Sequence, residues 1–327
     1  MSPLSTTADR LVTDDGRVFP YIADTAWELF HRATPDEVDR YLDDRAAKGF
    51  TVIQAVVLAE LGGESEPNHA GELALIDQDP TRPNPAYMDF VEDVIRRCGE
   101  RGLRVALLPT WGSFVLRLWG NAPILINADN ARAFGTWIGA RFGHLDHLIW
   151  VLGGDRPPVH EGVDYRPVWR EMAAGIKAAE QTPHLMSYHP KGKETSADHL
   201  AGEDWLDFHM CQSGHHRADP GPAELIRRMK AADPGKPCLD AEPCYEDHPM
   251  DFDPDVGWFD AGDVEAAIRA GLEAGGAGFA YGAHPIWQWF DHGREPVSHV
   301  RRPWHEALDL PGSSRVAELG QLIARSS

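Results

Sequence analysis

The chain has 327 residues, of which 43% are hydrophobic and 25% are charged. This composition is typical of a folded globular protein and excludes a mainly disordered chain. The formal net charge is −20, which argues against binding to nucleic acid or to an anionic membrane surface, since both carry negative charge. A neutral or cationic partner fits better, and the oligomeric state is left open.

The N-terminal segment carries Asp9 and Arg10 where a secretory signal would be apolar, and no apolar run is long enough to span a membrane. We therefore expect a cytoplasmic protein without a membrane span. The four cysteines show neither a CxxC pair nor the spacing of a disulfide framework, so we expect free thiols and no bound zinc. These are Cys98, Cys211, Cys238 and Cys244.

Short β-branched and apolar runs alternate with longer amphipathic segments along the whole chain, which is typical of βα units with a parallel sheet. Helices are expected near 35–48, 85–101, 128–142, 165–180, 222–232 and 262–274. The first has Thr34 as N-cap, Pro35 at its first position and Glu37 at the capping-box position. Eight strands are expected, near 19–25, 51–59, 104–110, 147–153, 184–189, 206–212, 237–243 and 277–283.

The strand starts repeat about every 37 residues, which is close to the size of one βα unit of a barrel. A doubly wound sheet would need a glycine-rich turn after an early strand, but Trp27-Glu28-Leu29 follows the first one. The sequence therefore predicts a single-domain (β/α)8 TIM barrel over 1–327, with 1–18 as an N-terminal extension and 305–327 as a closing helix. The long segments 61–84 and 244–261 follow strands, so we expect them at the C-terminal face, where barrel active sites lie.

Two carboxylates follow opposite strands of this predicted barrel. Asp155 comes after two glycines at the end of the fourth strand, and Glu242 precedes a proline at the end of the seventh. Side chains at these positions can face each other across the barrel mouth. Such a pair suits cleavage of a glycosidic bond, in which one acid protonates the departing oxygen and the other, ionised, attacks or activates water.

Aromatic and polar residues surround these acids at the strand ends, as in sugar sites where rings stack on the CH face of a sugar. Trp289 is a further stacking candidate, whereas Trp119, Trp137, Trp150 and Trp169 are assigned to packing. The residues expected to bind substrate are Asp24, Trp27, Trp111, Arg156, His189, Gln212, His215, Tyr245, Tyr281 and Trp287.

Two other classes of barrel remain open. His189, His209, His215, His216 and His284 could form the metal site of a metal-dependent hydrolase, although no His-x-His pair opens the first strand. A carbohydrate-binding barrel without catalysis would keep the aromatic rim but would not need the acid pair. A Schiff-base aldolase is excluded because no lysine lies within a predicted strand. We expect no metal and no cofactor.

Five segments in this order resemble one family. They are Ala23-Asp24-Thr25-Ala26-Trp27, Trp150-Val151-Leu152-Gly153-Gly154-Asp155-Arg156, the stretch from Gln212 to His215, Glu242-Pro243-Cys244-Tyr245-Glu246, and Tyr281-Gly282 before Ile286-Trp287. Over nearly the whole chain the sequence resembles the apiosidase-like glycoside hydrolases, a (β/α)8-barrel group that includes glycoside hydrolase family 140. The resemblance implies a retaining glycosidase with Asp155 as general acid/base and Glu242 as nucleophile. We expect its substrate to be a small carbohydrate, either a glycoside or an oligosaccharide. Glu246 is the reserve candidate for a catalytic role.

Overall fold

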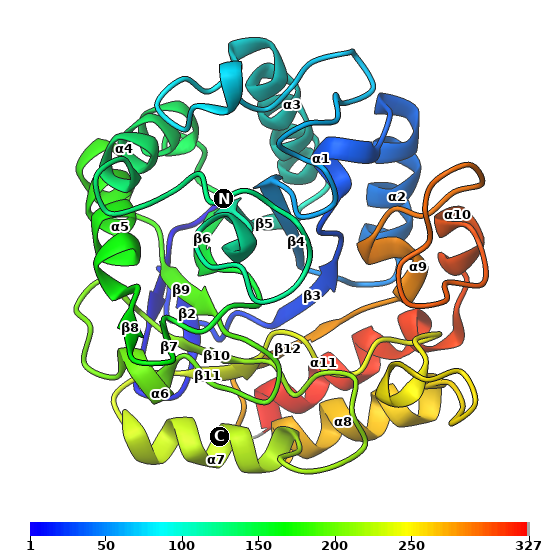
Figure 1. Ribbon diagram of the computed structural model, residues 1–327. Helices are drawn as coiled ribbons and strands as arrows, with labels where there is room; N and C mark the ends of the chain where they lie inside the picture. Colours follow the sequence, from blue (N-terminus) through cyan, green and yellow to red (C-terminus); the bar gives the residue numbers. More distant parts are fainter. Residues whose placement is uncertain (326–327) are drawn as a thin grey trace.

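Eight parallel strands form a nearly closed barrel in the computed structural model, which describes residues 1–325. Figure 1 looks along the barrel, with the strands inside and the helices around them. The hydrogen-bonded order is β10-β11-β12-β3-β4-β5-β6-β9. The prediction of a (β/α)8 TIM barrel is confirmed. The strands are β3 (Tyr21–Thr25), β4 (Val52–Leu58), β5 (Arg104–Thr110), β6 (Leu148–Gly153), β9 (Met186–His189), β10 (His209–Cys211), β11 (Cys238–Asp240) and β12 (Gly278–Tyr281).

The first long helix of the outer layer begins where the sequence supplies a cap. The Thr34 side chain accepts the N–H of Glu37, and the Glu37 carboxylate accepts the N–H of Thr34, so the predicted capping box is present. The longer helices are α2 (Pro35–Ala47), α3 (Pro85–Glu100), α4 (Ala131–Phe142), α5 (Arg166–Ala179), α7 (Pro222–Ala232), α8 (Ala261–Glu273) and α11 (Val316–Arg325). The short ones are α1 (Leu29–Arg32), α6 (Ala197–Leu200), α9 (His284–Trp287) and α10 (Trp304–Ala307), with 3-10 turns η1 (Ile76–Gln78), η2 (Gly112–Phe114), η3 (Met250–Phe252) and η4 (Pro311–Arg315).

One seam interrupts the hydrogen-bonded sheet, between β9 and β10. Three contacts bridge it. The N–H of Asp207 donates to the carbonyl of Met186 at 2.8 Å, and the N–H of Met186 donates to the Asp207 carboxylate at 2.7 Å. The Ser187 hydroxyl donates to the carbonyl of Phe208 at 2.7 Å. The seam is therefore held partly by side chains, whereas the other strand pairs share main-chain ladders.

Strand alternation decides which side chains of β3 enter the barrel. The Tyr21 hydroxyl and the Thr25 hydroxyl both contact the side chain of Gln54, which also donates to the carbonyl of Ala241 across the interior. Asp24 lies between these inward positions in sequence and points outward, against Tyr41 and Arg45 of α2. Tyr281 is paired with Asp24 in the register of β12 and β3 and therefore shares the outward face.

The two chain ends differ in detail from the prediction. Residues 1–18 contain an antiparallel hairpin, β1 (Leu4–Thr6) and β2 (Leu11–Thr13), and Arg104 at the start of β5 donates to the carbonyl of Ser2. The hairpin thus lies at the N-terminal ends of the barrel strands. The closing segment is divided into α10, η4 and α11, because Pro311 and Gly312 interrupt it. The last two residues of the predicted 305–327 helix lie outside the described residues.

Residues 1–325 contain no helix that combines the length and the apolar character needed to cross a bilayer. The four cysteines are free and buried, as predicted. A small antiparallel hairpin, β7 (Val159–His160) and β8 (Val163–Asp164), follows β6 on the way to α5.

Candidate active site

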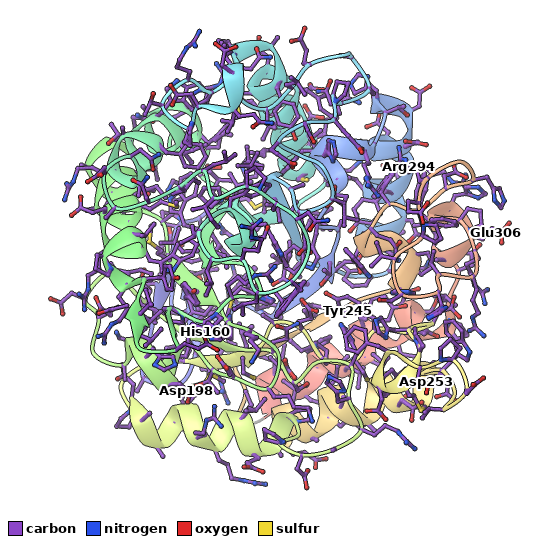
Figure 2. The ribbon with its side chains drawn as sticks, in the orientation of Figure 1. His160, Asp198, Tyr245, Asp253, Arg294 and Glu306 are labelled. Atoms are coloured by element: carbon purple, nitrogen blue, oxygen red, sulfur yellow. The ribbon has the colours of Figure 1, made fainter. Side chains whose placement is uncertain are left out.

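A cavity of about 860 Å³ opens at the C-terminal ends of the strands. Both long segments predicted for this face contribute to its wall, the first through Leu61 and the second through His248 and Phe252. Figure 2 shows Tyr245 inside the ring of helices, near the middle of the view. The predicted site residues that line the cavity are Trp27, Trp111, Asp155, Gln212, His215, Glu242, Tyr245 and Trp287.

Asp155 reaches the cavity through a turn that only glycines permit. Gly153 and Gly154 have φ values of +87° and +104°, a region that favours glycine. A Cβ on Gly153 would lie 2.4 Å from the carbonyl of His189, and one on Gly154 would lie 2.8 Å from the Trp111 ring. Asp155 itself has φ +57°, an uncommon conformation for a residue with a side chain. The backbone is therefore specialised to present this carboxyl group.

The surroundings of Asp155 favour its protonated form. Burial raises the pKa of Asp155 well above its usual range, and the negative charges of Glu242 and Glu60 raise it further. The Arg156 guanidinium acts in the opposite direction, but it lies 3.5 Å from the carboxylate and is shared with Glu60, 3.4 Å away. The net effect is a carboxyl group that can donate a proton.

Polar side chains surround both carboxylate oxygens of Glu242. The Gln212 amide donates to Oε1 at 2.7 Å, and the Nε2 of His215 lies 3.1 Å from the same oxygen. The Nε2 of His189 faces Oε2 at 3.3 Å. Burial raises the pKa of Glu242, but the neighbouring His189 and His215 outweigh it and lower the pKa to about 2. This carboxylate is ionised at neutral pH.

The hydrogen bonds of the two imidazoles indicate which ring nitrogens carry hydrogen. The main-chain N–H of Tyr245 donates to Nδ1 of His215 at 3.3 Å, so Nε2 of His215 carries the hydrogen that points at Glu242. In His189, Nδ1 faces the carbonyl of Pro190 at 3.1 Å and must be the donor. Its Nε2 is the ring atom that faces Glu242.

Aromatic rings form the wall below the two acids. The Trp27 and Trp111 rings are 5.2 Å apart, and both contact the His189 ring. The Trp27 indole N–H donates to the Tyr245 hydroxyl at 3.2 Å. Trp287, on another side of the cavity, donates its indole N–H to His284 at 3.1 Å. A ring-lined cavity with a few polar groups is the arrangement that sugars require.

Arg156 and His189 lie directly behind the cavity lining. Both are fully buried. The Arg156 guanidinium donates to the carbonyls of Leu116 and Asp155, so main-chain groups fix its position. These two predicted site residues therefore contact the acids and do not line the cavity.

Asp24 and Tyr281 do not reach the cavity, because both occupy outward positions of their strands. The Asp24 carboxylate accepts from the Tyr41 hydroxyl at 2.6 Å and from Arg45 at 2.7 Å. Burial raises the pKa of Asp24, and the paired Arg45 opposes this effect. The Tyr281 hydroxyl donates to Glu246 at 2.6 Å. The geometry corrects the prediction that Asp24 and Tyr281 bind substrate.

Glu246, the reserve candidate, faces a different depression, beside η4. Its carboxylate accepts the N–H of Gly312 at 2.9 Å in addition to the Tyr281 hydroxyl. Burial raises the pKa of Glu246. This side chain fixes the C-terminal segment to the barrel and is separate from the Asp155 and Glu242 cavity.

Two tryptophans were assigned to the wrong place. Trp289, a stacking candidate, is fully buried and stacks on Trp304 with 4.4 Å between ring centroids. Trp119, assigned to packing, is 43% exposed and lines the cavity, where its ring covers the Arg156 guanidinium at 3.9 Å. Trp119 lies after η2 in a segment without regular structure, which sequence periodicity does not identify.

Other cavity residues were missed altogether. Glu60 follows β4 directly, and Ser113 lies in η2, where its hydroxyl is buried without a hydrogen-bond partner. The position of Glu60 at a strand end was the available signal. The remaining missed lining residues include Leu61, Asn121, Lys191, Lys193, His248, Phe252 and Ser298.

The histidines at the mouth stack on one another. The His215 and His248 rings lie 4.1 Å apart and nearly parallel, and His284 packs edge-on to His248 at 4.3 Å. Burial lowers the pKa of His284 to about 3 and lowers that of His248 further. His209 lies elsewhere and bonds to Ser196 and Asp233. Within residues 1–325 no three His, Cys, Asp or Glu side chains are grouped as metal ligands would be.

Comparisons with known proteins show the family of the chain. The family model of the apiosidase-like catalytic domain matches residues 5–327. A glycoside hydrolase family 5 structure from Bacteroides vulgatus ATCC 8482 is 27% identical, with TM-score 0.86 over 96% of this chain and 70% of that one. A second structure, named a glycoside hydrolase, is 28% identical, with TM-score 0.88 over 98% of this chain and 74% of that one. No curated protein matches.

A third structure, the exo-β-1,4-mannosidase from Opitutaceae bacterium strain TAV5, is 13% identical, with TM-score 0.62 over 98% of this chain and 63% of that one. At this identity the likeness concerns the fold alone. Taken together, the barrel and its matches define a TIM-barrel glycosidase. The chain belongs to the apiosidase-like family, and it matches that family's catalytic domain.

Proposed function

We propose that this glycosidase hydrolyses an O-glycosidic bond with retention of configuration, with Asp155 as general acid/base and Glu242 as nucleophile. The proposed substrate is a small glycoside or a short oligosaccharide. A cavity of about 860 Å³ has room for a ligand of that size. The family resemblance supports the same two roles.

One observation carries this proposal: two carboxyl groups line one cavity, and their surroundings drive their ionisation in opposite directions. The pKa of Asp155 is raised by burial and by Glu242, whereas the histidines next to Glu242 lower its pKa to about 2. The surroundings thus favour the acid form of Asp155 and the anionic form of Glu242. Opposite shifts of this kind distinguish the acid from the nucleophile in a glycosidase.

The chemistry follows from these states. Asp155 donates its proton to the glycosidic oxygen while a Glu242 oxygen bonds to the anomeric carbon, and the bond to the leaving group breaks. Asp155, now ionised, takes a proton from water, and the water oxygen replaces Glu242 on the anomeric carbon. His215 and Gln212 donate to Glu242 when its charge returns. Each step conserves charge and needs no group outside the chain and water.

The first experiment assays the protein on a panel of 4-nitrophenyl glycosides, furanosides included, beside Asp155→Ala and Glu242→Ala. We expect kcat/KM to fall by about 10²-fold or more in both folded variants. Glu306→Gln is the matched control, because this exposed carboxylate on α10 lies at the edge of the molecule (Figure 2). Full activity in either variant contradicts the assignment of that residue.

A second measurement tests retention. NMR of the freshly released sugar reports its first anomer, and we expect the anomer of the substrate. Azide added to Glu242→Ala should restore cleavage of an activated glycoside and give the glycosyl azide of opposite configuration. Release of the opposite anomer by the wild-type protein contradicts the nucleophilic role of Glu242 and indicates an inverting pair.

A further inference from the structure

A second group of side chains meets on the Asp155 side of the cavity. The buried Arg156 guanidinium has Glu60 at its edge, with Nη2 3.4 Å from the carboxylate, and Trp119 over its face at 3.9 Å. Glu60 and Trp119 both line the cavity. Since main-chain carbonyls already fix Arg156, the guanidinium serves as a rigid support for both residues.

The turn that carries Glu60 is clamped by a fully buried carboxylate. Glu28 accepts the N–H of Leu61 at 3.0 Å and contacts His31 at 2.9 Å. Arg32 donates to the carbonyl of Leu61 at 3.2 Å. These contacts hold both the main-chain N–H and the main-chain carbonyl of Leu61, the residue after Glu60. The direction of the Glu60 side chain is therefore set before any ligand arrives.

The Glu60 side chain is 23% exposed, and its ion pair with Arg156 is long, at 3.4 Å. Burial raises the pKa of Glu60 to about 7, against the opposing charge of Arg156. Near neutral pH this carboxyl group can either accept or donate a hydrogen bond. Both abilities suit contact with sugar hydroxyls.

Trp119 supplies the complementary apolar surface. One ring face covers Arg156, and the side chain is still 43% exposed at the cavity edge. An indole supported on one face and open on the other is a platform for the CH face of a sugar. A carboxyl group beside such a platform is the usual pairing for a polyhydroxylated ring.

The charges around this group define the class of ligand. Lys191 pairs with Glu194 at 3.3 Å, and Lys193 donates to main-chain carbonyls of Ala218 and Asp219. The cationic groups are thus occupied, whereas Glu60 and the two catalytic acids face the cavity. An acidic sugar would add a further negative charge here, so a neutral ring is favoured.

We infer that Glu60 and Trp119 form a second sugar-binding subsite, which takes a neutral sugar ring on the leaving-group side of the bond that Asp155 protonates. This inference rests on the proposed function, because the side is defined by the role of Asp155. The Glu60 carboxylate accepts hydrogen bonds from hydroxyls of the leaving sugar, and the Trp119 indole stacks on the ring of that sugar.

The test compares two substrates that share one glycone. The first is a neutral disaccharide, and the second is the glycosyl fluoride of its non-reducing sugar, which has no leaving sugar. We expect Glu60→Ala and Trp119→Ala each to lower the ratio of kcat/KM for disaccharide over fluoride by at least 10-fold, mainly through KM. Trp119→Phe and Glu60→Gln should restore part of the ratio, because a ring and a hydrogen-bonding group remain.

Ile124→Ala is the matched control for Trp119, since Ile124 is 48% exposed on the same segment and lies outside the cavity lining. Equal losses on both substrates overturn the subsite and leave the proposed function intact. Wild-type protein that cleaves no glycosyl fluoride, aryl glycoside or disaccharide overturns both. If a disaccharide whose leaving sugar is a uronic acid is cleaved faster than the neutral disaccharide, the inference of a neutral leaving sugar is wrong.

Discussion

Nε2 of His215 lies 3.1 Å from Oε1 of Glu242. The opposite ring nitrogen accepts a main-chain N–H, so the hydrogen on Nε2 is directed at the carboxylate. His215 thus helps to keep the pKa of Glu242 low, at about 2. A nucleophile must be ionised, and activity on the acid side is lost when pH falls through its pKa.

From this we predict the effect of His215→Ala. Without the imidazole the pKa of Glu242 rises, so the acid limb of kcat/KM moves to higher pH, by about one pH unit. Measurement of kcat/KM from pH 2 to pH 6 on protein that stays folded checks this, with His160→Ala on the β7–β8 hairpin as control (Figure 2). An acid limb that stays in place shows that His215 does not set the charge of Glu242.

The alkaline limb should report Asp155. A general acid works below its pKa, so activity falls as pH rises through it. Asp155 is faced by Glu60, Glu242 and Arg156, and Glu60→Gln removes one negative charge while leaving Arg156 to Asp155 alone. Both changes lower the pKa of Asp155, and we expect the alkaline limb to move to lower pH. A limb that moves upward or not at all contradicts this coupling, and Glu306→Gln serves as control.

The buried ion pair between Asp24 and Arg45 should stabilise the folded protein. Asp24→Ala leaves the fully buried Arg45 without its main partner, which should lower the free energy of unfolding by about 3–5 kcal/mol. Asp43→Ala removes a pair with Arg101 in which Asp43 is 68% exposed, and should cost less than about 1 kcal/mol. Urea unfolding of the two variants measures both values. Equal costs would show that the Asp24 pair is no stronger than a surface pair.

Gly282 packs closely against the ring of Tyr245, which lines the cavity with Glu242. A Cβ at this position would lie 2.0 Å from the Tyr245 ring, so Gly282→Ala must displace Tyr245. We expect a loss of about 1–3 kcal/mol in the free energy of unfolding, together with lower kcat/KM. Gly235→Ala is the control, because its Cβ would meet a single atom at 3.9 Å. Unchanged stability and activity in Gly282→Ala would contradict the rigid packing of Tyr245.

The sequence predicts the barrel well because each strand is a short apolar run, and all eight expected runs contain a strand of the structure. Asp155 and Glu242 share the cavity because parallel strands end on one face. Whether an individual side chain at a strand end points into the barrel or outward was predicted less well. Asp24 and Tyr281 also end strands, but alternation directs them outward.

The cavity residues in loops could not be predicted from the sequence for a different reason. Trp119 and Glu60 lie outside the strands, and no period relates them to the cavity. Their positions depend on Arg156 and on the Glu28 clamp, which join residues distant in sequence. Such contacts are set by the folded barrel and cannot be read from local sequence.

The seam between β9 and β10 separates the two acids. Asp155 follows β6, on one side of the seam, and Glu242 follows β11, on the other. Along unbroken ladders the path from one acid to the other runs through β12, β3, β4 and β5. The separation of the carboxyl groups decides between retention and inversion. The side chains of Asp207 and Ser187 bridge this seam, so a substitution at either one loosens the shorter of the two connections between the acids.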